Sequence, residues 1–199
     1  MSVRLYDDAI VTKINNWVKD KNMRIMSPDE TTEQFRMIAN QTNDKPISLP
    51  LITIARSNEI EIENTSKRML TYDGMMLDAT KDKSLQIDAI PMILNYQIDI
   101  YSKDEVEADE YMRNFVFNII NHPKLKVYLP YNQINYEHWS YMRLLSTIED
   151  NSDTPLRLAS DQFTRWTIRF TVDDAYLFSL PYKDNVSIEY KLEMEEEIK

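Results

Sequence analysis

The side chains that most often carry out chemistry are scarce in this sequence. It contains no cysteine and only two histidines, His122 and His138. Thiolate and imidazole groups hold most zinc, copper and iron–sulfur centres, so sites of these kinds are not expected. Any chemistry that depends on histidine has to use one of these two residues.

His138 is the stronger of the two candidates, because Glu137 precedes it and a carboxylate can raise the basicity of an imidazole. Such a pair would suit a small hydrolase that uses carboxylates and His138. Adjacent residues on a strand point to opposite faces, however, so Glu137 would not orient His138. The position of His122 before Pro123 is explained by the end of a helix. We therefore expect His138 to be a packed or hydrogen-bonded residue.

Three groups of neighbouring acids offer the oxygen ligands that magnesium and calcium prefer, namely Asp7-Asp8, Asp173-Asp174 and Glu195-Glu196-Glu197. Each group has a simpler explanation: the first as a helix cap, the second as a strand end and the third as a solvated tail. Their spacing does not gather them into one site. We predict no catalytic residue, no metal ligand and no cofactor-binding residue.

Gly74 is the only glycine among 199 residues. Phosphate-binding loops, nucleophile elbows and dinucleotide folds need several glycines, so these enzyme classes are excluded. The pair Asp73-Gly74 predicts a type I′ hairpin turn. Methionine suits surfaces that adapt to a partner, although burial in the core is the alternative. A subunit interface is expected on the residues that flank this turn: Met69, Tyr72, Met75 and Met76.

The net charge of −10 bounds the partners of the chain. It repels a phosphate backbone, which argues against a general nucleic-acid binder and against binding to an anionic membrane. An acidic wall would still suit a conduit through which DNA slides without adhering. Residues 1–20 mix acids with isolated apolar side chains, and no apolar run approaches the ~20 residues that cross a bilayer. We expect a soluble chain that is made in the cytoplasm, with no membrane partner.

Two helices are predicted near the N-terminus. Asp7 or Asp8 can cap the first, and its apolar residues recur at helical spacing: Ile10, Ile14, Trp17 and Val18. The second begins with a capping box between Ser27 and Glu30, with Pro28 at the first helical position.

The clearest unit is a strand that turns directly into a helix. Apolar and polar residues alternate over 94–101, which predicts a strand with one buried face. Ser102 then caps a helix, and Glu105 is placed to complete a capping box. The helix is expected to stop before Pro123, which excludes helical geometry at His122.

Further strands are expected over residues 49–55, 59–63, 124–129, 139–148, 163–172 and 186–194. In one of them Glu59, Glu61 and Glu63 alternate with isoleucines, which gives an acidic face. The economical architecture is a single α+β domain over residues 1–199. It consists of an antiparallel or mixed β-sheet with helices packed mainly on one face, plus a β-hairpin arm. Residues 57–85 form a hairpin-bearing insertion in this scheme, and residues 183–199 form a C-terminal extension.

Aromatic side chains gather over residues 128–141. Tyrosine and tryptophan dominate the positions that contribute most to binding at protein interfaces. We expect Tyr131, Tyr136 and Trp139 to contact a partner protein, with coverage of the sheet as the alternative.

The order of these elements resembles that of bacteriophage tail-terminator and tail-completion proteins. The run Tyr96-Gln97-Ile98-Asp99-Ile100-Tyr101-Ser102, which leads into a helix over 108–120, and the strand at 161–170 carry the resemblance. It is a likeness of layout, and it includes the N-terminal amphipathic helix. The family has no invariant catalytic signature to compare.

The resemblance implies a non-enzymatic structural protein of the virion. In this family a ring, of six subunits here, ends tail tube or sheath polymerisation at the head-proximal end and docks to head–tail connector proteins. DNA passes through the lumen, which either the Glu59, Glu61 and Glu63 face or the C-terminal acids would line. The chain is then expected in the host cytoplasm during assembly and in the tail or neck of the virion.

Other functions stay open at this point. Within virus assembly, the chain could be another head–tail connector or a baseplate component. From different classes, it could be a small hydrolase or a monomeric adaptor that binds one host protein.

Overall fold

The computed structural model describes residues 2–18, 23–39, 49–62, 70–76, 85–131, 134–152 and 164–178. The helices in these ranges are α1 (Ser2–Trp17), α2 (Pro28–Ala39) and α3 (Glu105–Asn121). The strands are β1 (Arg24–Met26), β2 (Leu51–Ile62), β3 (Leu70–Met76), β4 (Leu85–Ser102), β5 (Lys124–Tyr131), β6 (Ile134–Asp150) and β7 (Thr164–Phe178). The predicted α+β class is confirmed.

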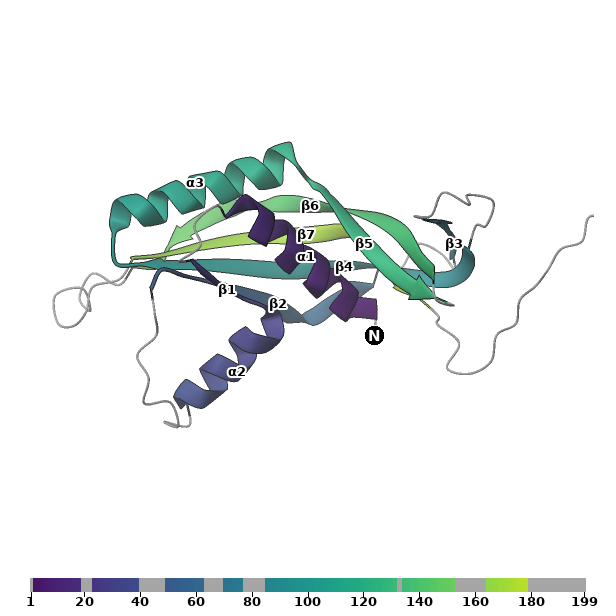
Figure 1. Cartoon of the computed structure of the whole chain (residues 1–199), viewed down its shortest axis with the longest axis horizontal. Coiled ribbons are helices and arrows are strands. Elements are labelled where there is room, and N and C mark those ends of the chain that lie inside the picture. The colour runs from purple at the N-terminus through teal and green to yellow at the C-terminus, as the bar shows by residue number, and fades with distance from the viewer. Residues whose placement is uncertain are drawn as a thin grey trace, which may run out of the picture.

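All seven described strands belong to one curled sheet (Figure 1). The strand order is β1-β2-β4-β3-β6-β5, and β7 pairs with both β4 and β6. β1 and β2 are parallel, and the other pairs are antiparallel. The sheet is therefore mixed, and β2 and β5 lie toward its opposite edges.

The long strands β4 and β7 form the centre of the sheet. Ile98 pairs with Ile168 and Tyr96 pairs with Phe170, so residues of the same parity face the same side. All four side chains are buried. The alternation predicted over 94–101 and 163–172 is confirmed, because these residues form the apolar face of the sheet.

Helices α1 and α3 cover this apolar face (Figure 1). Ile10 and Ile14 of α1 join Phe115 and Ile119 of α3 in one core cluster with the sheet. The shorter helix α2 packs against β1 and β2 instead. The prediction that helices lie mainly on one face is therefore confirmed.

Helix α1 also connects the two edges of the curled sheet. The Asp7 carboxylate forms an ion pair with Arg56 of β2 and accepts a hydrogen bond from the Tyr96 hydroxyl at 2.7 Å. Further along the helix, Lys13 Nζ donates to the backbone carbonyl of Lys124 in β5 at 2.8 Å. One helix thus closes the open side of the curl.

The predicted cap of α1 is wrong, because the helix begins at Ser2 and both candidate caps lie inside it. Asp7 is buried and Asp8 is exposed. The sequence pattern around Asp7 resembles a cap, but its side chain has a partner on another element, Arg56. This tertiary ion pair explains a carboxylate inside the helix.

The capping box of α2 is confirmed. The Ser27 backbone N–H donates to Glu30 Oε2 at 2.9 Å, and the Glu30 N–H donates to Ser27 Oγ at 3.3 Å. Pro28 is the first helical residue, as predicted.

Helix α3 ends as predicted, at Asn121, but it begins differently. Its cap is Asp104, whose carboxylate accepts a hydrogen bond from the Val106 N–H at 2.9 Å. Ser102 is the last residue of β4, and its hydroxyl accepts from the Asp104 N–H at 3.1 Å. The predicted cap at Ser102 is therefore wrong by two residues, because the strand pairing with β7 extends to Ser102.

The predicted turn at Asp73-Gly74 is also wrong. Both residues lie inside β3, where they pair with Gln86 and Leu85 of β4, and Gly74 has no positive φ. β3 and β4 do pair in antiparallel register, and residues 77–84 between them lie outside the described residues. At its end β3 also pairs with β6, at Met75, so sheet pairing on two sides overrides the local turn signal.

The predicted strands at 49–55 and 59–63 are one strand, β2, with an irregularity between Arg56 and Ile60. Residues 57–62 are all exposed, so the isoleucine face of this end is not buried in the chain itself. Within the range 57–85, the described residues 57–62, 70–76 and 85 belong to β2, β3 and β4. The predicted strand at 186–194 and the extension at 183–199 lie outside the described residues.

Candidate binding groove and the buried histidine

His138 of β6 lies in the interior of the protein. Its side chain is 4% exposed. The imidazole is in edge-on contact with three aromatic side chains: Tyr6, Tyr176 and Phe178. Its Nε2 atom lies 2.8 Å from the backbone carbonyl oxygen of Asp174 and 2.9 Å from Ser140 Oγ. Ser140 also donates to the Asp174 carbonyl, at 3.0 Å.

The histidine and the serine therefore hold one backbone carbonyl. Asp174 has a φ of 55°, which is uncommon for a residue other than glycine, and the two hydrogen bonds stabilise that conformation. Burial lowers the pKa of His138, which favours the neutral imidazole. Neither His138 nor Ser140 lines the groove described below. This geometry fits the predicted packed and hydrogen-bonded role of His138.

The other residues considered for chemistry also have structural partners. His122 is exposed and caps the C-terminal end of α3. Asp173 is bound by Arg143 Nε at 2.6 Å and by Thr171 Oγ1 at 2.9 Å. Burial alone would raise the pKa of Asp173, but the hydrogen bond from Arg143 lowers it. Among the described residues, no three histidine, aspartate or glutamate side chains gather as a metal site. The run Glu195-Glu196-Glu197 lies outside them.

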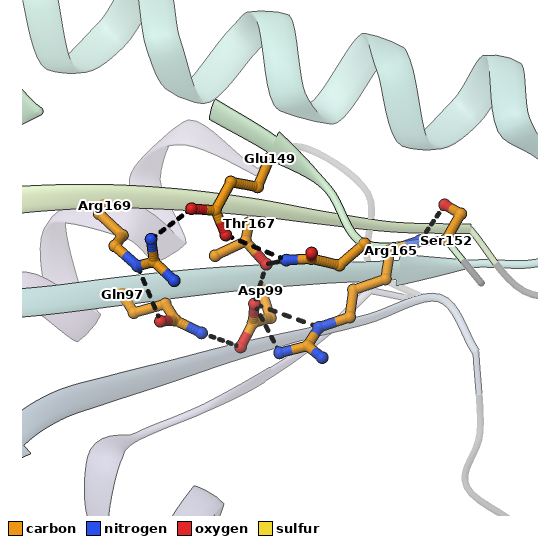
Figure 2. A network of polar contacts seen from close by, with 8 residues as sticks. Gln97, Asp99, Glu149, Ser152, Arg165, Thr167 and Arg169 are labelled. Atoms are coloured by element: carbon orange, nitrogen blue, oxygen red, sulfur yellow. Dashed lines mark hydrogen bonds and ion pairs between the residues drawn. The ribbon is translucent and has the colours of Figure 1, made fainter. Parts of the chain in front are cut away.

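The face of β4 and β7 that points away from the apolar core carries a polar network (Figure 2). Asp99 is its centre and is only 4% exposed. Its carboxylate accepts hydrogen bonds from Thr167 Oγ1 at 2.6 Å, Gln97 Nε2 at 2.8 Å and Arg165 Nε at 3.3 Å.

The network extends from Asp99 to β6. Gln97 accepts a hydrogen bond from Arg169 Nε at 3.3 Å, and Arg169 also forms an ion pair with Glu149 (Figure 2). Asn151 donates to Thr167 at 2.8 Å. Each acid of this network is paired with an arginine, Asp99 with Arg165 and Glu149 with Arg169. The network therefore connects β4, β6 and β7.

A groove with a volume of about 560 Å³ lies between α1 and the outer face of β5 and β6. One wall is formed by α1, with Asp8, Thr12 and Lys13. Tyr128 and Trp139 belong to the opposite wall. The helix wall is mainly polar. The strand wall, called the aromatic wall below, carries Tyr128 and Trp139 beside Lys124 and Lys126.

A lysine is held within the aromatic wall. Lys126 Nζ lies 4.9 Å from the ring centre of Trp139 and 5.8 Å from that of Tyr128, and it contacts Glu137 Oε1 at 2.7 Å. Trp139 is 43% exposed and Tyr128 is 46% exposed. Exposed aromatic side chains beside a cation suit a ligand that presents both apolar and acidic groups.

The structure separates the three residues that were predicted to contact a partner. Trp139 is exposed in the groove, whereas Tyr136 is 5% exposed and belongs to the core. The interface prediction for Tyr136 is therefore wrong in the isolated chain, because its parity along β6 matches that of buried His138. Tyr131 ends β5, and its side chain lies outside the described residues.

The predicted subunit interface and lumen are only partly described. Tyr72, Met75 and Met76 lie on β3, but their side chains are not among the described ones, and Met69 is outside the described residues. Glu59 and Glu61 are exposed at the end of β2, and Glu63 lies outside. These assignments stay predictions.

Tyr128 belongs to the aromatic run 128–141 that the sequence singles out, whereas sequence reasoning missed Lys126 and the contribution of α1 to the groove. A signal was present in the alternation of Lys124, Lys126 and Tyr128 with buried Leu125 and Val127, which gives β5 a polar and aromatic outer face. The lysine of α1 carries no such signal, since only the tertiary structure brings α1 beside β5.

No model of a known protein family matches this chain, and a comparison with curated proteins finds no relative. Among the described helices, none has the length and apolar character needed to cross a membrane.

Proposed function

We propose that this chain is a virion assembly protein of the tail-terminator type. A ring of its copies occupies the head-proximal end of a phage tail, ends tube or sheath polymerisation and presents a docking face to the head connector. The mechanism is blocking, without a chemical step: the surface that would add another tube or sheath layer is replaced by a different one.

The observation that carries the proposal is the order of elements in the sheet. Helix α1, strand β2, the β4–α3 unit and the closing strands β5 to β7 follow one another in the layout on which the resemblance to tail terminators rests. The strand-to-helix unit runs through the residues that carry the likeness, from Tyr96 to Ile120.

The surface chemistry supports a binding role as well. The groove beside α1 presents exposed Tyr128 and Trp139, whereas His138 and Ser140 are buried and both bound to a backbone carbonyl. Exposed aromatic side chains contribute strongly to protein–protein binding. The side chains that are exposed to a partner are thus of the types that bind proteins.

Deletion of the gene from the phage that encodes it tests the proposal. We expect tails that are longer than normal or not joined to heads, because polymerisation continues past its usual end. Supplying the wild-type chain in trans restores joined tails of normal length. Cryo-electron microscopy of complemented particles is expected to place a ring of this chain between tail and head.

Normal tails joined to heads in the deletion strain contradict the proposal. A ring located at the far end of the tail assigns the chain to the baseplate instead, and a ring inside the neck but above the tail end assigns it to the connector. The His138→Ala variant is the matched control, since complementation by this variant is expected wherever it folds, and a folded variant that fails to complement supports the hydrolase alternative.

A further inference from the structure

Two surfaces of this molecule expose apolar side chains beside charged ones. The charges are negative on one surface and mainly positive on the other. One is the end of β2, residues 57–62, and the other is the groove between α1 and the outer face of β5 and β6. We call them the β2 tip and the α1–β5 groove. They belong to opposite edges of the strand order.

The β2 tip is a strand with two different faces. Ile60 is 43% exposed and Ile62 is 63% exposed on one face. Glu59 and Glu61 alternate with them on the other face and are also exposed. Within the described residues, β1 pairs only with Leu51 to Thr53, and β4 pairs with one side of the tip, so the outer backbone edge of the tip has no strand beside it. An exposed edge strand with apolar side chains is a ready site for association.

The α1–β5 groove offers both apolar contact and positive charge, which are complementary to the isoleucines and glutamates of the tip. The aromatic wall, with Tyr128 and Trp139, offers apolar contact to isoleucines. The lining contains three lysines, Lys13, Lys124 and Lys126, against one aspartate, Asp8, and Lys126 is also paired with Glu137 at 2.7 Å. This excess of positive charge is local, because the chain as a whole carries −10.

We propose that the β2 tip of one copy docks in the α1–β5 groove of a neighbouring copy. Isoleucines of the tip lie against the aromatic wall, and its glutamates lie near the groove lysines. This contact rests on the proposed function in one respect, since it supplies the repeated contact that a ring of subunits needs. It assigns Glu59 and Glu61 to the subunit contact and not to the lumen.

The contact joins two different surfaces, so each copy retains a free tip and a free groove after one contact has formed. Such heterologous contacts repeat from copy to copy and produce a closed ring where the rotation permits. Charge complementarity of this kind fixes the register and accelerates association.

A charge-reversal pair tests the contact, with oligomer mass measured by light scattering in solution. Glu59→Lys alone and Lys124→Glu alone place like charges at every contact, and we expect loss of the wild-type oligomer in each. An equal mixture of the two variants restores it. In an alternating ring, every contact then joins opposite charges, because the reversed tip meets the reversed groove and the unchanged tip meets the unchanged groove.

The matched control is Glu110→Lys, which reverses an exposed glutamate on α3. This variant is expected to keep the wild-type oligomer. Single variants that remain oligomeric, or a mixture that stays dissociated, overturn the proposal. So does a wild-type chain that is monomeric at every concentration and that fails the cross-linking test.

The absence of cysteine allows that second test without background. An equal mixture of Glu61→Cys and Thr12→Cys proteins is expected to give a thiol cross-linked dimer, because Thr12 lines the groove. The product is expected to be lost when Phe117→Cys, on the exposed side of α3, replaces Thr12→Cys. The double variant Glu61→Cys/Thr12→Cys is expected to give a covalent ladder, and a ladder that stops at the dimer overturns the head-to-tail arrangement.

The two proposals fail separately. Oligomers that survive charge reversal and cross-link only through Phe117→Cys leave the assembly function standing and remove this contact. Confirmed tip-to-groove contacts in a protein whose deletion leaves normal, joined tails keep the contact and remove the terminator function.

Discussion

The two faces of the β4–β7 strand pair are equally buried at their centre but are stabilised by different physical effects. On the covered face, Ile98 and Phe170 are 0% exposed beneath the helices. On the opposite face, Asp99 is 4% exposed and Thr167 is 1% exposed, and they are bonded to each other at 2.6 Å. A low exposed fraction therefore does not reveal what stabilises a residue.

The two faces differ in the stabilising free energy that is lost when a side chain is shortened. Apolar burial contributes about 25 cal/mol per Å² of surface removed from water, and a cavity adds a further cost. A neutral hydrogen bond contributes only about 1 kcal/mol net, but an unpaired buried polar group costs about 1–3 kcal/mol. On the covered face, the free energy of unfolding should thus fall when an apolar side chain is shortened. On the opposite face, called the polar face below, it should fall when a hydrogen-bond partner is removed.

The largest effect is expected on the covered face, from Phe115→Ala in α3. Phe115 is 0% exposed and packs against Trp17 with ring centres 5.9 Å apart. We expect the free energy of unfolding to fall by about 3–5 kcal/mol in denaturant titration, because the truncation leaves a cavity in the core.

The matched control is Phe117→Ala, two residues along the same helix, where the side chain is 63% exposed. Its effect on the free energy of unfolding is expected to stay within about 0.5 kcal/mol. Equal losses at the two positions would mean that α3 does not pack on the sheet as described.

On the polar face, Asp99→Ala is expected to lower the free energy of unfolding by a smaller amount. This change removes the acceptor of three hydrogen bonds and leaves Arg165, which is 33% exposed, without its carboxylate. We expect a loss of about 2 kcal/mol in the free energy of unfolding, measured in the same way.

Asp173→Ala is the control for that change on the same face, since its partner Arg143 is 61% exposed and water can replace the carboxylate. Its loss is expected to stay below about 1 kcal/mol. A larger loss at Asp173 than at Asp99 would contradict the central role of Asp99 in the network.

The smallest effect concerns pH and the neutral His138 of the covered side. Burial lowers the pKa of His138 in the folded chain, so the unfolded chain binds the proton first as the pH falls below about 6.5. The stabilisation is complete above that pH and is lost as the pH falls toward the folded pKa. The slope contributed by one group is at most about 1.4 kcal/mol per pH unit.

Denaturant titration between pH 7 and pH 5 measures this slope. We expect the stability of the wild type to decrease more steeply than that of His138→Gln, whose amide can still donate to the Asp174 carbonyl but does not titrate. Parallel slopes for the two proteins would place the His138 ring in contact with water.

Much of the fold could be predicted because it follows from local patterns. The 3.6-residue spacing of Ile10 and Ile14 predicts α1, and the reciprocal pair Ser27 and Glu30 predicts the start of α2. The proline at 123 predicts the end of α3. In each case the residues that define the element lie within a few positions of it, or the apolar residues recur on one side of it.

Three of the wrong predictions, those of two caps and a turn, share one physical cause. Asp7, Ser102 and Gly74 each lie in a sequence context that favours a cap or a turn, and each is drawn into longer-range structure. Asp7 binds Arg56 of β2, and strand pairing extends through Ser102 and Gly74. Local signals of about 1 kcal/mol are outweighed where several backbone hydrogen bonds and a partly buried ion pair compete with them.

The candidate site shows the same division. The aromatic content of residues 128–141 is visible in the sequence, and Trp139 was identified from it. Whether a given residue of β6 faces the core or the groove depends on register, which places Tyr136 inside and Trp139 outside. Both the even-numbered and the odd-numbered residues of β6 include aromatic side chains. The alternation alone therefore does not show which of the two sets is buried.

The α+β class, the alternating faces of β4 and β7 and the shortage of glycine, cysteine and histidine follow from residue type and from spacing along the chain. The tertiary structure alone decided that α1 lies against both edges of the curled sheet, with Asp7 bound to β2 and Lys13 bound to β5. It thereby formed a groove from residues more than a hundred positions apart. Contacts at such separations depend on how the whole sheet curls, and no local pattern of residues encodes that curl.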